Sequence, residues 1–173
     1  MSLVYMDSSA WVKRYIAEPG SEVMDALWTE IDQGRLQATC LWLGFTESVW
    51  VLQRRRNAGS LSLHAFATVY QQFRQDCERV AWIGISWERV QASVVWIVKH
   101  NLNSADALHL QAALEQQAQT SEGIWLVSSD RRLVRAARAE GLQIFNPVGL
   151  TQLPIAFLLE LEAVACESPY STA

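Results

Sequence analysis

The chain has 173 residues, half of them hydrophobic and 18% charged, and its formal net charge is −4. This size and composition predict one globular domain with a core of its own and exclude an intrinsically disordered chain. The negative net charge excludes binding to a polyanion through bulk charge alone.

Cysteine usage and hydropathy exclude further classes. Cys40, Cys77 and Cys166 are odd in number and form no CxxC pair, which argues against a disulfide framework or a zinc site and for reduced thiols. No apolar run approaches the roughly 20 residues of a transmembrane helix. The first residues also lack a basic segment followed by an apolar one. We therefore expect a soluble, cytoplasmic protein without a membrane partner.

Short apolar runs alternate with amphipathic segments along the chain. The first half predicts a strand at 3–6, helices at 8–17 and 21–32, a strand at 36–39, and helices at 41–57 and 62–79 with Ser62 as the cap of the last. The second half predicts a strand at 80–85, helices at 87–100 and 101–117 with Ser104 as the cap of the latter, a strand at 124–127, a helix at 131–140 opened by Asp130, and a strand at 142–146. Strands separated by helices, without hairpin turn signals, indicate an α/β protein with a parallel sheet covered on both faces.

The segment after residue 147 is not part of this alternation. Pro147, Gly149 and Pro154 mark a loop, and the apolar run at 155–165 predicts one more helix. We expect a domain at 1–147 and an extension at 148–173 whose helix packs on the domain or on a partner.

Two of the predicted strands end in an acid at the sheet edge where open parallel sheets form their sites. Asp7 ends "LVYMD" and Asp130 ends "WLVSSD". Each acid is also a good N-cap for the helix that follows it. Because one carboxylate can serve both roles, capping does not exclude catalysis.

Two more acids lie within predicted helices. Asp106 is in the first turn of its helix, where the helix dipole favours an acid, but its neighbours on that face are mainly apolar. Glu47 lies on an apolar stripe, where an unpaired carboxylate is costly. The alternative explanation for Glu47 is an ion pair with Arg54, two turns further on. His109 is expected to be a packed or hydrogen-bonded helix residue rather than a proton donor.

Convergence of these four acids at the sheet edge would account for all of them together. Their mutual repulsion then needs a cation, and an oxygen-only ligand set selects one or two hard divalent ions, Mg²⁺ or Mn²⁺. Such an ion activates water and stabilises charge on a phosphodiester.

Four segments resemble those of PIN-domain ribonucleases, in particular the toxins of VapBC-type toxin–antitoxin pairs. They are "VYMDSSAWVKRYIAEPGSE", "TESVWVLQRRRNAG", "LNSADALHLQAAL" and "WLVSSDRRLVRAARAEGLQIFNP", and they cover residues 4–147 in the family's order. The resemblance implies a parallel five-stranded sheet in the order 3-2-1-4-5, Mg²⁺- or Mn²⁺-dependent cleavage of single-stranded or looped RNA, a homodimer, and a cognate antitoxin protein as partner. In one departure, a Ser or Thr is often found a few residues before the second acid, and here "CLWLGF" replaces it.

Carried over by position, the resemblance assigns the catalytic and metal-binding quartet and two supporting residues. The quartet is Asp7, Glu47, Asp106 and Asp130, and the supporting hydroxyls, expected to hold metal-bound water, are Ser9 and Ser128. Candidates to hold the RNA backbone are Arg54, Arg55, Arg131 and Arg135. The alternative for these arginines is solvated helix surface, with cations near a helix C-terminus.

Two other functions stay open to test. A PIN-like module could bind RNA or protein without turnover, although the intact quartet argues against it. Mg²⁺-dependent phosphoryl transfer through an aspartyl phosphate is disfavoured, because a phosphatase of that kind needs a second acid where Ser9 stands. Neither Lys13 nor Lys99 suits the late-strand lysine of a receiver domain.

Overall fold

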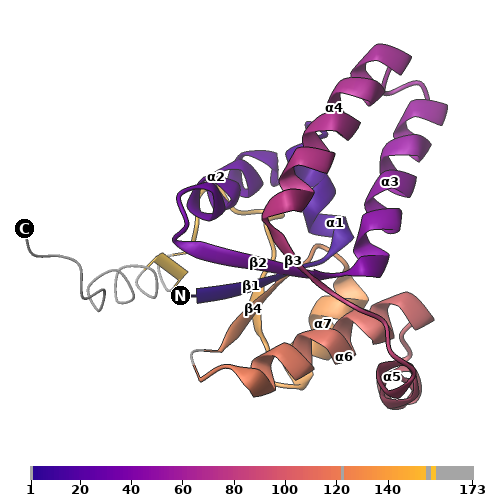
Figure 1. Ribbon diagram of the computed structural model, residues 1–173, viewed down its shortest axis with the longest axis vertical. Coiled ribbons are helices and arrows are strands. Elements are labelled where there is room, and N and C mark those ends of the chain that lie inside the picture. The colour runs from indigo at the N-terminus through magenta and orange to yellow at the C-terminus, as the bar shows by residue number, and fades with distance from the viewer. Residues whose placement is uncertain (1, 122, 155–156, 159–173) are drawn as a thin grey trace, which may run out of the picture.

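A parallel sheet forms the centre of the molecule (Figure 1). The computed structural model describes residues 2–121, 123–154 and 157–158. The strands are β1 (Ser2–Met6), β2 (Leu36–Leu41), β3 (Val80–Ile83), β4 (Ile124–Val127) and β5 (Gln143–Phe145). They lie in the order β3-β2-β1-β4-β5, and each neighbouring pair is parallel. This confirms the predicted α/β class and strand order.

Helices cover both faces of the sheet (Figure 1). On one face lie α1 (Ser8–Trp11), the 3₁₀ turn η1 (Val12–Arg14), α2 (Ser21–Asp32), α3 (Trp42–Asn57), α4 (Leu63–Asp76) and the 3₁₀ turn η2 (Cys77–Arg79). On the other lie α5 (Trp87–His100), α6 (Ser104–Gln119) and α7 (Arg131–Ala139). Among the described residues, no helix is both long and apolar enough to cross a membrane.

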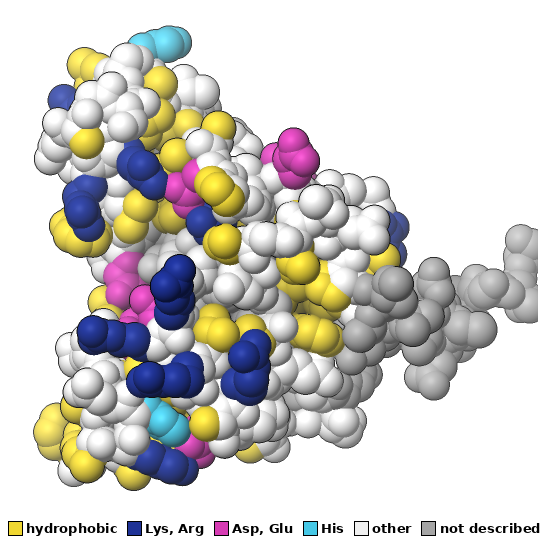
Figure 2. Space-filling model, turned by 180° about the vertical axis from the view of Figure 1, so that it is seen from behind, with side chains coloured by type: hydrophobic (Ala, Val, Ile, Leu, Met, Phe, Trp, Pro, Cys, Tyr) yellow, Lys and Arg dark blue, Asp and Glu magenta, His cyan; other side chains and the backbone are white. Residues whose placement is uncertain are grey.

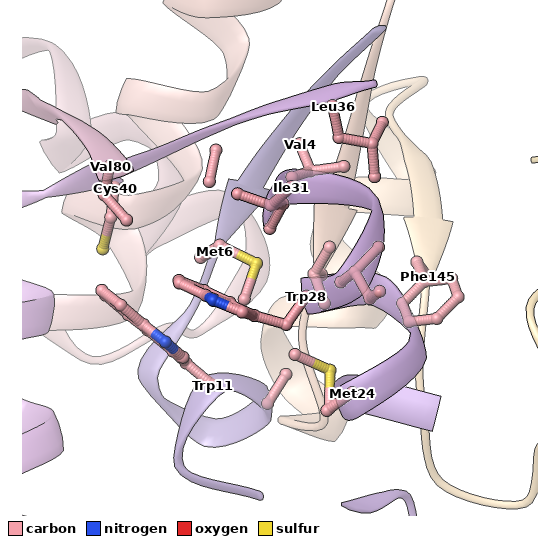
Figure 3. Close-up of a cluster of buried hydrophobic side chains, with 14 of the residues drawn as sticks. Val4, Met6, Trp11, Met24, Trp28, Ile31, Leu36, Cys40, Val80 and Phe145 are labelled. Carbon is pink, nitrogen blue, oxygen red and sulfur yellow. The ribbon is translucent and has the colours of Figure 1, made fainter. Parts of the chain in front are cut away.

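The two faces of β1 supply two separate hydrophobic clusters, because successive side chains of a strand point to opposite sides. Met6 packs toward α2, where Trp11 and Trp28 stack with ring centroids 5.7 Å apart (Figure 3). Tyr5 faces the other way and belongs to the cluster beneath α6 and α7, with Leu110 among its members. This alternation brings a buried phenol to the side of the sheet that α6 covers.

Two predictions about helix ends were wrong. The helix expected at 8–17 ends at Trp11 and continues only as η1, because Arg14 and Tyr15 turn to bind the carboxylate of Asp76 on α4. The cap of α6 is Asn103 and not Ser104, since the Asn103 side chain accepts the Asp106 amide at 2.8 Å. Capping of α4 by Ser62 and of α7 by Asp130 is confirmed.

Most of the extension predicted after residue 147 lies outside the described residues, including 155–156 and 159–165 of the expected helix. Of the described part, Leu153 and Phe157 are buried in the cluster on the α2 side. The Phe157 ring lies 5.5 Å from that of Trp125 and 5.6 Å from that of Phe145. The described end of the chain therefore packs on the sheet, while the division at 147 stays a prediction.

Candidate active site

The four acids are delivered by four different elements at the carboxyl edge of the sheet. Asp7 follows β1 and Asp130 follows the adjacent strand β4, whose ends are tied by a 3.0 Å bond from the Asp7 amide to the Val127 carbonyl. Glu47 lies in the second turn of α3, the helix that leaves β2. Asp106 lies in the first turn of α6. The topology therefore gathers residues that are as far as 123 positions apart in the sequence.

Asp7 is the most tightly held of the four. Its side chain is only 4% exposed, and its Oδ2 accepts the hydroxyls of Ser9 and of Ser128, the latter at 2.9 Å. Ser9 Oγ in turn accepts the backbone amides of Ser129 and Asp130 at 2.9 and 3.1 Å. Ser9 and Ser128 thus fix the Asp7 carboxylate directly and join the ends of β1 and β4, while their expected contact with metal-bound water stays a prediction.

Asp130 is both a cap and a member of the acidic group. Its Oδ1 accepts the backbone amides of Arg132 and Leu133 at 2.8 and 2.9 Å, which satisfies the first turn of α7. Within the described part of the chain, Oδ2 of the same carboxylate has no hydrogen bond. Capping therefore leaves one oxygen of Asp130 for another ligand.

Asp106 shows that the acids act on one another. Burial raises the pKa of its half-buried carboxyl to about 6, with the charges of Asp130 and Asp7 as the next causes. The side-chain amide of Asn103 donates to its Oδ2 at 2.8 Å. The raised pKa therefore reflects burial first and then the like charges of the neighbouring acids.

Glu47 has a histidine as its partner, which corrects the expectation of an oxygen-only environment. His109 Nε2 lies 2.8 Å from Glu47 Oε2, and His109 Nδ1 lies 2.8 Å from the Tyr5 hydroxyl. The ion pair with Arg54 does not form; the Arg54 guanidinium lies 4.6 Å from the centre of the Trp50 ring. The expectation that His109 is packed and hydrogen-bonded is confirmed, since it is fully buried.

His109 responds to the acids around it. Burial by itself lowers the pKa of this imidazole, but the hydrogen bond to Glu47 and the charges of Asp7, Glu47 and Asp106 outweigh burial, so the pKa is raised above its usual value. Tyr5 was missed in the sequence. Its signal was the alternation of β1, which places residue 5 opposite Met6 and toward the helix that carries His109.

The chemistry of this group fits a divalent cation. One ligand atom each of Asp7, Glu47 and His109 lies within 4.8 Å of the others. No lysine or arginine in the described ranges forms an ion pair with any of the four acids. Converging carboxylates that lack a cationic side chain are the oxygen ligands that Mg²⁺ and Mn²⁺ prefer.

Basic side chains lie on either side of the acids. Figure 2 shows acidic side chains in a hollow at one edge of the molecule, with Lys and Arg side chains above and below it. Arg54 and Arg55 line a pocket together with Val51. Val51 lies one helical turn after Glu47 on α3. Arg131 and Arg135 are exposed on α7. Arg55 is also paired with Glu18 at 2.5 Å, and Arg135 donates to the His100 carbonyl at 3.3 Å, so these two are partly committed within the fold.

Comparison with solved structures agrees with this architecture. The protein PAE2754 from Pyrobaculum aerophilum is similar with a TM-score of 0.63 and 17% identity, over 94% of this chain and 90% of that one. VapBC2 from Rickettsia felis, solved bound to a DNA fragment from its promoter, is similar with a TM-score of 0.54 and 12% identity, over 83% of this chain and 98% of that one. No family model and no curated protein sequence matches the chain. At these identities the likeness is one of fold, and the fold is PIN-like, of the VapC kind.

Proposed function

From this PIN-like, VapC-like fold and its acidic edge, we propose that the chain is a Mg²⁺- or Mn²⁺-dependent endoribonuclease, the toxin of a type II toxin–antitoxin pair. The observation that carries the proposal is the gathering of Asp7, Glu47, Asp106 and Asp130 at one sheet edge without a pairing lysine or arginine among the described residues. Such an arrangement is costly for a structural role alone, and it is useful where a cation and a phosphodiester must be bound together.

The four acids are suited to hold one or two ions, because each keeps a carboxylate oxygen outside the hydrogen bonds of the described residues. A bound divalent ion would supply positive charge for the phosphodiester and would make water more acidic. Ser9 and Ser128 keep the Asp7 carboxylate in one orientation. The protein therefore contributes carboxylate oxygens that are held in fixed positions for the ion.

Asp106 is suited to proton transfer, since its pKa of about 6 lies near neutral pH. In the proposed reaction a water oxygen bonds to phosphorus, the bond from phosphorus to O3′ breaks, and O3′ takes up a proton. The water gives its proton to a carboxylate, for which Asp106 is the best candidate. The products carry a 5′-phosphate and a 3′-hydroxyl.

The remaining parts of the proposal concern partners. Arg54, Arg55, Arg131 and Arg135 would hold the backbone of single-stranded or looped RNA, since they lie on the two helices that carry or follow acids of the site. A cognate antitoxin and a homodimer follow from the resemblance in the sequence, and a cytoplasmic location follows from the odd number and spacing of the cysteines.

The test is cleavage of an end-labelled, loop-containing RNA by the purified protein with Mg²⁺, with Mn²⁺, or with EDTA. Cleavage is expected only with a divalent ion. Asp7→Asn and Glu47→Gln should each lose more than about 100-fold, because loss of a mere partner of a ligand already costs about 10- to 100-fold. The matched control is Glu78→Gln, an exposed acid on η2, which should cleave like the wild type. Equal cleavage in EDTA, or by Asp7→Asn, would overturn the proposal.

The second candidate is a PIN-like module that binds RNA or protein without turnover. It is favoured if the protein binds RNA, yet sequencing of RNA ends after induced expression gives no ends absent from an Asp7→Asn control.

A further inference from the structure

A buried chain of hydrogen bonds runs from Tyr5 on β1 through His109 on α6 to Glu47. The Tyr5 hydroxyl lies 2.8 Å from His109 Nδ1, and His109 Nε2 lies 2.8 Å from Glu47 Oε2. Tyr5 and His109 are both fully buried, whereas the Glu47 side chain is 25% exposed. The chain therefore runs from the core to Glu47, whose carboxylate accepts no backbone amide or hydroxyl among the described residues.

The direction of these bonds follows from the surroundings of Tyr5. Burial, with the nearby charge of Asp7, holds the pKa of its phenol well above the usual value, so the phenol keeps its proton. If the imidazole is neutral, Tyr5 donates to Nδ1 and Nε2–H donates to Glu47. If it is charged, both nitrogens carry protons, so Nε2–H donates to Glu47 in either state.

Packing around the ring keeps it in this place. Gly44 lies one turn before Glu47 on α3, and a β-carbon there would clash with Cys40 Sγ and would lie 3.6 Å from His109 Cε1. The absence of a side chain at Gly44 lets α3 approach the end of β2 and close over the imidazole. Helix α3 and the ring are thus seated against each other, which leaves the ring little freedom to turn.

We propose that His109, held by Tyr5, is a positioning residue that fixes the Glu47 carboxylate toward Asp7 and is not itself a metal ligand. The proposal rests on the proposed function, since the carboxylate is fixed for the divalent ion of that site. Both ring nitrogens are already used, Nδ1 by Tyr5 and Nε2 by Glu47. The bond occupies Glu47 Oε2 and leaves Oε1 for the ion, as an outer partner does for a ligating carboxylate.

The competing arrangement is direct ligation, because a His109 nitrogen is among the three ligand atoms that lie within 4.8 Å of one another. Ligation through Nε2 would require that nitrogen to lose both its proton and its bond to Glu47. An imidazole ligand would also shift the preference of the site toward Zn²⁺ and away from Mg²⁺ and Mn²⁺. The two arrangements therefore differ in whether an imidazole nitrogen is bound to the ion, and electron spin echo modulation of bound Mn²⁺ measures that difference.

The first experiment measures Mn²⁺ binding without RNA, by the electron paramagnetic resonance signal of free Mn²⁺. His109→Leu, which keeps bulk but removes the donor, is expected to weaken binding about 10- to 100-fold. His109→Gln should restore most of the affinity, because its amide nitrogen can donate from near the position of Nε2. Tyr5→Phe removes only one hydroxyl and should weaken binding by a smaller factor. The control is His64→Gln, an exposed histidine on α4, which should bind like the wild type.

The second experiment records electron spin echo modulation of bound Mn²⁺ in the wild type, where no nitrogen coupling of a directly bound imidazole is expected. Such a coupling, lost in His109→Gln, would overturn the proposal, and so would full affinity in both His109→Leu and Tyr5→Phe. Circular dichroism of each metal-free variant checks its fold. If His109→Leu does not fold, Tyr5→Phe and the echo experiment test the proposal in its place.

Asp7→Asn separates the proposed function from the positioning role of His109. If Asp7→Asn binds Mn²⁺ normally, the metal site of the proposed function is wrong; if only the His109 variants bind normally, this inference alone is wrong.

Discussion

In the metal-free protein, the surroundings of Asp106 disfavour the charged form of its carboxyl. Its pKa is raised from 3.8 to about 6 in the folded protein, first by burial and then by the charges of Asp130 and Asp7. The folded protein therefore binds this proton more tightly than the unfolded chain does, so stability falls as pH rises from about 4 through 6. In EDTA, the free energy of unfolding in urea should be higher at pH 5 than at pH 7.5. A full pKa unit corresponds to about 1.4 kcal/mol, and solvent screens a half-exposed group, so the gain from this residue should be about 1 kcal/mol.

The same residue gives a matched variant. Asp106→Asn keeps a side-chain oxygen for the Asn103 amide but removes the charge. At pH 7.5 in EDTA it should be more stable than the wild type by about 1 kcal/mol, and its stability should change less between pH 5 and 7.5. Glu78→Gln, which changes an exposed acid outside the quartet, should follow the wild-type curve. A less stable Asp106→Asn at pH 7.5 would mean that burial and the neighbouring charges do not raise this pKa.

At the scale of elements, the hairpin of α3 and α4 extends beyond the sheet (Figure 1), and one buried network anchors its base. Asp76 at the end of α4 is 7% exposed and accepts Arg14 Nε and the Tyr15 hydroxyl, each at 2.7 Å. Asp76→Ala leaves the Tyr15 phenol and Arg14 Nε without their acceptor, while Arg14 Nη1 keeps its bond to Asp25, and removal of one partner of a buried pair costs about 3–5 kcal/mol. Urea unfolding should show a loss in this range, while Gln75→Ala, an exposed neighbour, should change little. A loss under about 1 kcal/mol would mean that water replaces the network.

Elements with strong periodicity were predictable from the sequence, and contacts between distant elements were not. The strand order followed from the resemblance, and Ser62 and Asp130 were recognisable caps because a cap depends on residues within one turn. The early end of α1 depends on Asp76, which is 62 positions from Arg14. The bond from His109 to Glu47 joins residues 62 positions apart, and no local pattern encodes it. Tertiary contacts of this kind decide which of several local options is realised.

For the whole molecule, the four acids make folding and metal binding depend on each other. Any ion that binds only the folded protein stabilises it, by about 2.7 kcal/mol at a concentration 100 times the dissociation constant. The melting temperature at pH 7.5 should therefore rise with Mn²⁺ for the wild type and rise much less for Asp7→Asn. Glu78→Gln, whose acid lies on η2, should respond like the wild type. The absence of any shift with the wild type would favour a binding module without a metal site.

The size of this stabilisation should depend on pH in the direction opposite to the stability of the metal-free protein. Carboxylates must lose their protons to bind an ion, and Asp106 with its pKa of about 6 is mostly protonated at pH 5 and mostly charged at pH 7.5. Mn²⁺ should therefore raise the melting temperature more at pH 7.5 than at pH 5, while the metal-free protein is more stable at pH 5. In Asp106→Asn, the two Mn²⁺ shifts should come closer together, because residue 106 no longer titrates between these pH values. An equal Mn²⁺ shift at both pH values in the wild type would show that Asp106 is not coupled to the ion, and it would leave Asp7, Glu47 and Asp130 as the binding set.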